Sequence, residues 1–293
     1  MGYFTVIALT LLAADAQPVS VPPGASGRSE AEQAAADATR TEPTVYFQAH
    51  RGGLDEVPEN TMAAFDYAWG IPGAVPEVDL RTTKDGVIVC LHDKTPRRTT
   101  NASEPWRDMD VAEIPYEQVR QWDAGAWFDE QYAGERVPTL DQVLARIVGH
   151  PQRQLYLDLK AVDVNTLIGR LLEIEVGKQV IFVHGDLHMC NTLSQTYDGA
   201  RTMTWLSGFP PHIKTKFGQY KKIDFRGLSQ LQLHLRTRRT KPKITYVFDE
   251  DYLAAALRRT REAGVALQLR PFAFDAQSLR PLIDLGVRWY VAD

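Results

Sequence analysis

The feature that most constrains the fold is the alternation of short β-rich runs with helical patterns from residue 44 to the end of the chain. The runs that we expect to form strands are 45–50, 75–80, 87–92, 154–160, 179–184, 202–207, 265–270 and 288–293. The helical patterns are 60–69, 139–148, 163–175, 250–263 and 276–285. Eight strands with helical crossovers predict an α/β fold with a parallel sheet, most simply a closed TIM (β/α)8 barrel. An open doubly wound sheet is the alternative, but it favours a glycine-rich loop after the first strand, and none follows.

One segment interrupts the alternation. The chain has 293 residues, 44% of them hydrophobic, which suffices for one large core. Residues 94–137 follow the third expected strand and form an insertion that we place over the carboxyl face of the barrel, where loops carry function. Trp106, Trp122, Trp127 and Phe128 lie in it. We expect them to pack the insertion onto the barrel, with a choline cage or a lipid-facing lip as the alternative.

The amino-terminal residues differ in composition from the rest. Residues 1–14 carry no charge, and Ala14-Asp15-Ala16 fits a small-x-small cleavage site. The run is short for a bilayer span but suits a signal peptide, so we predict a signal peptide over 1–16 and export to the periplasm or the exterior. A misassigned start or a buried apolar start is the alternative, because no Lys or Arg precedes the run. Residues 17–43, rich in Pro, Gly and Ala, read as a flexible leader to a barrel over 44–293.

Charge and cysteine content exclude several classes of function. The net charge is −4, and the only basic block, "LRTRRTKPK" (235–243), is interpreted as a solvated loop, so no nucleic-acid partner is expected. Nor do we expect a stable membrane span; the oligomeric state stays open. The spacing of Cys90 and Cys190 matches no zinc or redox motif. Export would permit a disulfide, but two buried free thiols are our expectation.

Polar side chains gather where the expected strands end. Because the carboxyl ends of barrel strands share one rim, groups that are distant in sequence can converge there. The residues at or near these ends are His50, Glu77, Asp79, His92, Asp158 and Lys160.

Two of these residues predict a metal site. Glu77 and Asp79 are two apart in a strand, so both point to the inner face with Val75. Two inward carboxylates repel each other unless a cation lies between them, and their oxygens suit Mg²⁺ or Ca²⁺. Asp158 offers a third oxygen, and Lys160 adds a cation for an anionic substrate. The alternative is ion pairing of the carboxylates with Arg51 or Lys160.

Two histidines and an arginine complete the rim. His50 and His92 are a candidate acid–base pair, because imidazole titrates near neutral pH and phosphodiester cleavage moves two protons. Arg51 offers a planar fork to phosphate oxygens, or else a salt bridge to Asp79 or Asp93.

The residues after Arg51 form a turn and a helix start. Gly52 and Gly53 suit a tight turn. We expect Asn60 and Thr61 to cap the following helix rather than contact substrate.

The motifs around these residues resemble the glycerophosphodiester phosphodiesterase family. They are "AHRGGLDEVPENTMAAF", "EVDLRTTKDGVIVCLHD", "RRTTN", "AGAWFDEQYAGERVPTLDQVL" and "LYLDLK", in order over about residues 46–160. "AGVALQLRPF" and "LIDLGVRWYVAD" are similar to the family's last two strands more loosely. The resemblance implies a TIM barrel with an inserted segment, one divalent cation, and hydrolysis of glycerophosphodiesters to glycerol 3-phosphate and an alcohol.

The resemblance also implies roles for single residues. His50 and His92 would share general acid and base work, and Arg51 and Lys160 would bind phosphate. The implied metal ligands are Glu77, Asp79 and Asp158. The family usually has a glutamate at the position of Asp158; relatives with an aspartate include the sphingomyelinase D-like branch, so a lysophospholipase D or sphingomyelinase D-like activity on a lipid is the alternative function.

Two further departures concern the end of the chain. "LRPFAFD" stands where the family has a Trp-Thr-Val-Asn signature at the seventh strand, which changes one wall of the pocket. No closing helix follows the last strand, so we expect the leader to cover that face or the sequence to be truncated.

A second motif points to another class of enzyme. "HGDLHMCNTL" (184–193) is similar to the catalytic loop of small-molecule phosphotransferases, in which Asp186 would be the base and Asn191 and Asp224 would hold Mg²⁺. That fold needs an upstream nucleotide-binding lobe, where this chain has the phosphodiesterase motifs. A barrel that binds without cleaving is a further alternative, which the intact set of histidines and carboxylates disfavours.

Overall fold

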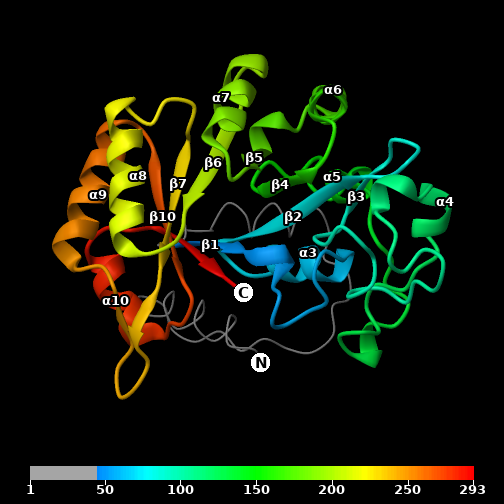
Figure 1. The fold of residues 1–293 in the computed structure, drawn as a ribbon, viewed down its shortest axis with the longest axis horizontal. Helices are drawn as coiled ribbons and strands as arrows, with labels where there is room; N and C mark the ends of the chain where they lie inside the picture. The colour runs from blue at the N-terminus through cyan, green and yellow to red at the C-terminus, as the bar shows by residue number, and fades with distance from the viewer. Residues whose placement is uncertain (1–44) are drawn as a thin grey trace, which may run out of the picture.

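The computed structural model describes residues 45–293, so the predicted signal peptide (1–16) and leader (17–43) lie outside the described residues. Eight strands form a ring in which every neighbouring pair is parallel, and the last strand pairs with the first (Figure 1). In ring order they are β1 (Tyr46–Ala49), β2 (Ala74–Thr82), β4 (Leu155–Ala161), β5 (Val180–Val183), β6 (Arg201–Leu206), β7 (Gln230–Leu235), β10 (Ala266–Pro271) and β11 (Trp289–Ala292). The predicted TIM barrel is confirmed.

One predicted strand lies outside the ring, and one strand of the ring was not predicted. The run at 87–92 gives β3 (Ile88–Cys90), which pairs antiparallel with β2 and stays outside the ring. The cause is a tight Asp85-Gly86 turn, in which Gly86 has a φ of 85° and the chain reverses as a hairpin. The eighth parallel strand is instead β7, "QLQLHL". Its glutamines face the barrel interior, so the sequence shows no continuous apolar run there.

A second hairpin lies outside the barrel as well. After β7, strands β8 (Thr237–Arg239) and β9 (Thr245–Tyr246) pair antiparallel with each other. This hairpin contains the basic block of the sequence.

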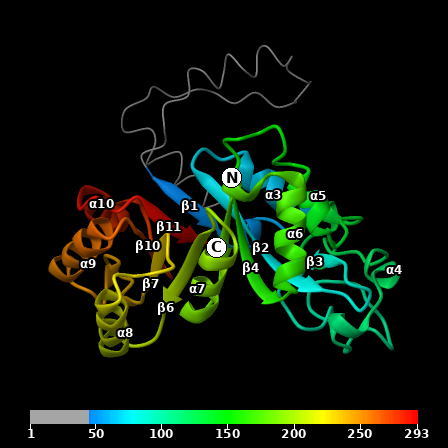
Figure 2. The same cartoon turned by 90° about the horizontal axis from the view of Figure 1, so that it is seen from above.

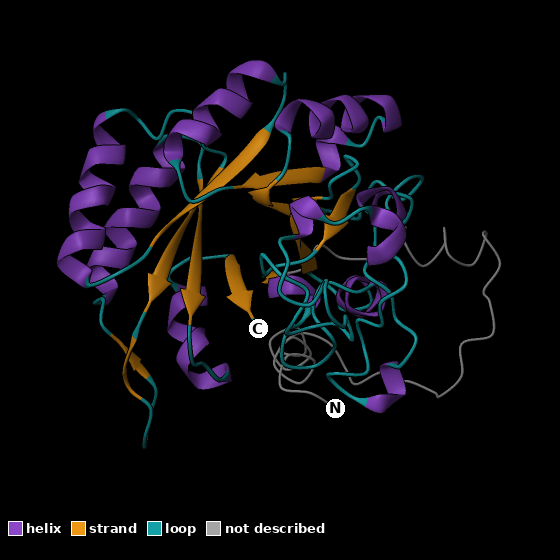
Figure 3. Ribbon diagram, turned by 45° about the vertical axis from the view of Figure 1, so that its right-hand side comes forward, coloured by secondary structure: helices purple, strands orange, loops and turns teal. Residues whose placement is uncertain are grey.

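Helices cover the outside of the ring (Figure 3). The expected helices form α3 (Met62–Trp69), α5 (Leu140–Leu144), α6 (Val164–Ile174), α9 (Glu250–Glu262) and α10 (Ala276–Asp284); α7 (Leu187–Thr196) and α8 (Pro210–Lys222) were not predicted. The short elements are α4 (Tyr116–Val119) and the 3₁₀ turns η1 (His50–Gly52), η2 (Val111–Glu113), η3 (Glu130–Tyr132) and η4 (Gly177–Gln179). No helix in the described part of the chain has the length and apolar character that a bilayer crossing requires.

The strands separate an outer apolar layer from a mostly polar interior. Outward residues such as Val78, Leu80 and Leu157 pack against the helices. The interior contains a small apolar cluster that includes Val75 and Tyr156. Because side chains alternate along a strand, the residues that follow Val75 and Tyr156 by two and four places also face inward, toward the carboxyl rim.

The insertion packs around its own core, to one side of the barrel (Figure 2). Trp122 is buried in that core and Trp106 packs against it, as expected for a packing role. Trp127 is partly exposed and donates its indole N–H to the carbonyl of Ala124 at 2.8 Å. Cys90 is a buried free thiol, as is Cys190.

Candidate active site

Three buried carboxylates meet at the carboxyl rim. Glu77 and Asp79 point inward from β2, as predicted, and the β2–β4 register pairs Asp79 with Asp158. Each of the three offers an oxygen, and these oxygens all lie within 4.8 Å of one another. The cluster could therefore hold one hard cation through oxygen ligands.

The electrostatics of this cluster fit a cation. Burial and the nearby charge of Glu77 raise the pKa of Asp158 to about 6. Burial also raises the pKa of Asp79, but the charge of Lys160 and a hydrogen bond from Asn60 outweigh it and leave the pKa lowered. The Oδ1 atom of Asp79 is buried without a hydrogen-bond partner among the described residues. Three buried carboxylates whose oxygens lie close together are the donor set that a divalent cation satisfies.

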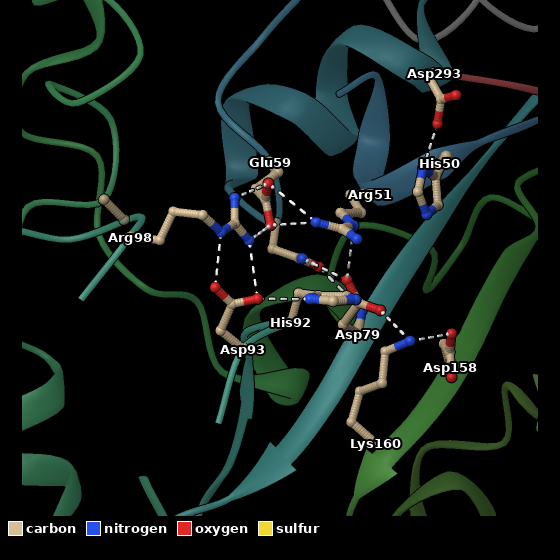
Figure 4. A network of polar contacts seen from close by, with 12 residues as sticks. His50, Arg51, Glu59, Asp79, His92, Asp93, Arg98, Asp158, Lys160 and Asp293 are labelled. Carbon is tan, nitrogen blue, oxygen red and sulfur yellow. Dashed lines mark hydrogen bonds and ion pairs between the residues drawn. The ribbon is translucent and has the colours of Figure 1, made fainter. Parts of the chain in front are cut away.

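Lys160 is the nearest positive charge to the cluster. Its Nζ lies 2.6 Å from Asp158 Oδ2 and 3.2 Å from Asp79 Oδ1 (Figure 4). These two carboxylates raise the pKa of Lys160 against the opposing effect of burial, so the amine stays protonated. The ion pairing considered from the sequence is therefore present in the structure.

Asn60 has a different role from the one predicted. Its side-chain amide donates to Asp79 Oδ2 at 2.7 Å, and its Oδ1 accepts the backbone N–H of Asp79 at 2.9 Å. The helix cap is Thr61 alone, whose hydroxyl accepts the N–H of Ala64 at 3.2 Å. Asn60 thus fixes the carboxylate of Asp79 from outside the strand. Its position just before a helix led to the prediction of a helix cap instead.

The chain leaves β1 through a strained turn that aims Arg51 at the cluster. Arg51 has a φ of 55°, and a Cβ on Gly52 would lie 2.6 Å from the Cβ of Ala64 in α3, so only glycine fits. The Arg51 guanidinium binds Glu59 at 3.0 Å and approaches Asp79 at 3.7 Å. Its Nε is buried and has no hydrogen-bond partner within residues 45–293.

His50 is held by a carboxylate from the last strand. Because β1 pairs with β11, the Nδ1 atom of His50 lies in hydrogen-bond contact with Asp293 Oδ1. Arg270 Nη2 lies 3.1 Å from the same oxygen. Burial raises the pKa of Asp293, but His50 and Arg270 outweigh it and the pKa is lowered. Arg270 Nη2 also lies 3.1 Å from Nδ1 of His50, but Asp293 is the nearer partner and an ionised carboxylate only accepts, so we assign the ring proton to Nδ1, which leaves Nε2 for chemistry.

His92 is held in the same way. It lies two residues beyond β3, so the hairpin brings it to the rim although its strand is not part of the barrel. Its Nδ1 is 2.7 Å from Asp93 Oδ1, and Arg81 fixes its carbonyl at 2.7 Å. Hydrogen bonds from Arg98 lower the pKa of Asp93 well below its ordinary range. Arg98 also binds Glu59, the partner of Arg51. Arg98 therefore links the carboxylate that holds His92 to the one that holds Arg51 (Figure 4).

A chain of amides crosses the barrel beneath the carboxylates. Gln48 donates to Glu77, Gln232 Nε2 donates to Gln48 Oε1 at 3.3 Å, and His234 Nε2 lies 3.0 Å from Gln232 Oε1. A further branch joins Gln232 to Gln268 at 2.8 Å. These amides fix Glu77 from below, and alternating glutamines are their only trace in the sequence.

The phosphotransferase-like motif has a structural role. Asp186 caps α7 by accepting the N–H of His188 at 2.9 Å, and Asn191 lies within α7. Asp224 forms an ion pair with Arg259. The residues upstream form the first half of the barrel rather than a nucleotide-binding lobe.

Fold and site define the class: a TIM-barrel protein with a candidate metal centre at the carboxyl rim, flanked by two carboxylate-paired histidines. The model of the glycerophosphoryl diester phosphodiesterase family matches residues 50–229, more than half of the chain. The chain belongs to this family.

Individual relatives match parts of the chain. A glycerophosphodiester phosphodiesterase of Caldanaerobacter subterraneus is 39% identical over 113 residues, which are 39% of this chain and 44% of the relative. One from Bacillus subtilis is 37% identical over 123 residues, 39% of this chain and 40% of the relative. The chain thus spans about half or less of the length of the curated relatives that it matches.

Solved structures share the fold over a greater length. The glycerophosphodiester phosphodiesterase of Agrobacterium tumefaciens superposes with a TM-score of 0.66 at 23% identity, covering 85% of this chain and 95% of that one. A phosphodiesterase of Oleispira antarctica, solved with the product sn-glycerol-3-phosphate, superposes with a TM-score of 0.61 at 21% identity, covering 84% and 92%.

Proposed function

We propose that the protein is a metal-dependent phosphodiesterase that hydrolyses glycerophosphodiesters to glycerol 3-phosphate and an alcohol. The observation that carries the proposal is the convergence of three buried carboxylates with two carboxylate-paired histidines on one rim, in a member of this family. The product bound to the Oleispira relative supports the same substrate class.

Glu77, Asp79 and Asp158 would hold the cation, either Mg²⁺ or Ca²⁺, because all three offer carboxylate oxygens. When bound, a divalent cation neutralises phosphate charge and stabilises the charge that develops during cleavage. Arg51 and Lys160 stand beside the carboxylates and bind the remaining phosphate oxygens. Arg51 suits a bidentate contact, and Lys160 acts as a point charge.

His50 and His92 move the protons. One Nε2 removes a proton from the attacking water as the new P–O bond forms. The other donates a proton to the alcohol oxygen as the old P–O bond breaks. Asp293 and Asp93 hold each ring at Nδ1 and stabilise its protonated form, as an orienting carboxylate does for a catalytic histidine.

A turnover panel tests this proposal. Glycerophosphocholine, glycerophosphoethanolamine, glycerophosphoinositol and glycerophosphoglycerol are offered to the full chain with Mg²⁺, Ca²⁺ or a chelator. We expect hydrolysis that stops on chelation and falls about 10²-fold or more in His92→Ala. Full activity in chelator rejects the metal role, and full activity in His92→Ala rejects the histidine assignment.

A lipid substrate is the second candidate. Two exposed phenylalanines, Phe209 and Phe272, lie near the barrel mouth, which favours a lysophospholipase D or sphingomyelinase D-like activity. Lysophosphatidylcholine and sphingomyelin in the same panel decide between the two substrate classes. Export stays a prediction from residues 1–16, which cell fractionation tests.

A further inference from the structure

The β8–β9 hairpin extends from the catalytic rim. It begins directly after the carboxyl end of β7, and Figure 1 shows it projecting beyond the end of that strand, next to α10. The hydroxyl of Tyr246 anchors its base, because it lies 3.2 Å from the carbonyl oxygen of Ala273 and 3.3 Å from Ser278 Oγ. The hairpin thus has a fixed base beside the barrel mouth.

The hairpin concentrates positive charge in a chain whose net charge is −4. No acidic residue lies between Leu235 and Phe248. The basic side chains of this segment make no ion pair with any carboxylate of the described residues: Arg236, Arg238, Arg239, Lys241 and Lys243. Elsewhere on the rim, Arg51, Lys160 and Arg270 each pair with a carboxylate. Exposed positive side chains that have no carboxylate partner among the described residues can bind an external anion.

Two exposed phenylalanines lie near the base of this basic hairpin. Phe209 is 71% exposed and has the Arg236 guanidinium 5.1 Å from its ring centre. Phe272 is 52% exposed, packs edge-on against His234 at 5.3 Å, and has Arg270 over its ring. His234 is near the carboxyl end of β7 and Arg236 directly follows the strand, so both rings lie at the carboxyl end of β7. The carboxyl rim of the barrel beside this hairpin therefore combines exposed aromatic side chains with cations that have no carboxylate partner among the described residues.

We propose that the β8–β9 hairpin, with Phe209 and Phe272, is a docking surface that places the barrel mouth on an anionic lipid bilayer. The cations bind the lipid headgroups, and the phenylalanine rings enter the boundary of the acyl region. Aromatic side chains favour a bilayer over a soluble polyanion, because a simple counter-charge needs no exposed apolar anchor. The docking goes beyond the proposed function, and it is measured without turnover.

Sedimentation with vesicles tests the charges. The full chain is mixed with phosphatidylcholine–phosphatidylglycerol vesicles or with phosphatidylcholine alone. We expect binding to the anionic vesicles only. Arg238→Gln with Arg239→Gln is expected to lower the partition coefficient by about tenfold or more. The matched control is Lys221→Gln with Lys222→Gln, which removes the same charge at the carboxyl end of α8, away from the rim, and leaves binding unchanged.

A second pair of variants tests the aromatic contribution. Phe209 is the N-cap residue of α8 and makes no side-chain cap, so Phe209→Ser keeps the helix start while removing the ring. We expect it to lower vesicle binding roughly tenfold. Ile223→Ser, at an exposed apolar residue after the other end of α8, serves as the control and leaves binding unchanged.

Several results overturn the proposal. These are absence of binding to anionic vesicles, equal loss in the hairpin and control variants, and unchanged binding in Phe209→Ser. Binding to a DNA oligonucleotide without binding to anionic vesicles also overturns it, in favour of a nucleic-acid surface. Because hydrolysis of soluble glycerophosphodiesters is assayed separately in each variant, failure of the docking surface and failure of the proposed function are distinguished.

Discussion

Replacing Asp158 by asparagine is expected to stabilise the protein while removing its activity. Burial beside Glu77 raises the pKa of Asp158 from 3.8 to about 6. A group with a raised folded-state pKa favours the folded state when protonated, so stability is lost as the pH rises from about 4 through 6. At neutral pH the metal-free protein carries this cost in full, and Asp158→Asn does not.

The magnitude follows from the size of the shift. Each pKa unit corresponds to about 1.4 kcal/mol, so the full shift is worth about 3 kcal/mol. The attraction of Lys160, 2.6 Å from Asp158, is already included in this shift, because it lowers the pKa of Asp158 against burial and Glu77. We therefore expect a gain of up to about 3 kcal/mol in the free energy of unfolding, or about 6–12 °C in Tm for a domain of this size.

Thermal unfolding in chelator, from pH 5 to pH 8, measures the effect. The Tm difference between Asp158→Asn and the wild type should be largest above pH 6 and should shrink toward pH 5. Asp198→Asn, at an exposed carboxylate, is the control and should give no such trend. A variant that is less stable than the wild type at pH 7.5, or a difference that does not depend on pH, refutes the reasoning.

Three further predictions concern the supports of the site. Asn60→Ala should destabilise the protein by about 2–3 kcal/mol in denaturant unfolding, because buried Asp79 loses both of its hydrogen bonds to this side chain; an effect below about 0.5 kcal/mol contradicts this. Asp293→Asn should lower kcat about 10²–10⁴-fold with little change in KM, because His50 loses the acceptor that fixes its tautomer; equal loss in kcat and binding points to misfolding instead. Gly52→Ala should cost about 2 kcal/mol or more, since φ is 90° and the added Cβ meets α3, and unchanged Tm argues against the turn.

The sequence predicted those site residues that lie on the carboxyl ends of regular strands. Glu77, Asp79 and Asp158 follow from side-chain alternation along β2 and β4, and the structure brings them together. His92 was correctly predicted to lie at the carboxyl rim, but the strand before it was wrongly expected to belong to the barrel. The second strand of an Asp-Gly hairpin and a parallel strand have the same β-rich composition.

The residues that support this site were harder to predict. Asp293 and Arg270 reach His50 only because β11 and β10 close the ring beside β1, a contact between chain segments more than 200 residues apart. Asn60 resembled a helix cap, since asparagine is a favoured cap residue. β7 was missed because its inward Gln232 is stabilised by Gln48 and Gln268 on β1 and β10, an arrangement that depends on closure of the barrel.

Direct measurement of metal binding tests the central claim. Chelator-treated full chain is titrated with Mg²⁺ and with Ca²⁺ in a calorimeter, in the wild type and in Asp79→Asn, with hydrolysis of glycerophosphocholine followed in the same samples. We expect one divalent cation per wild-type chain, restored hydrolysis on binding, and loss of both in Asp79→Asn. Undiminished metal binding in Asp79→Asn, or hydrolysis by the metal-free wild type, would contradict it.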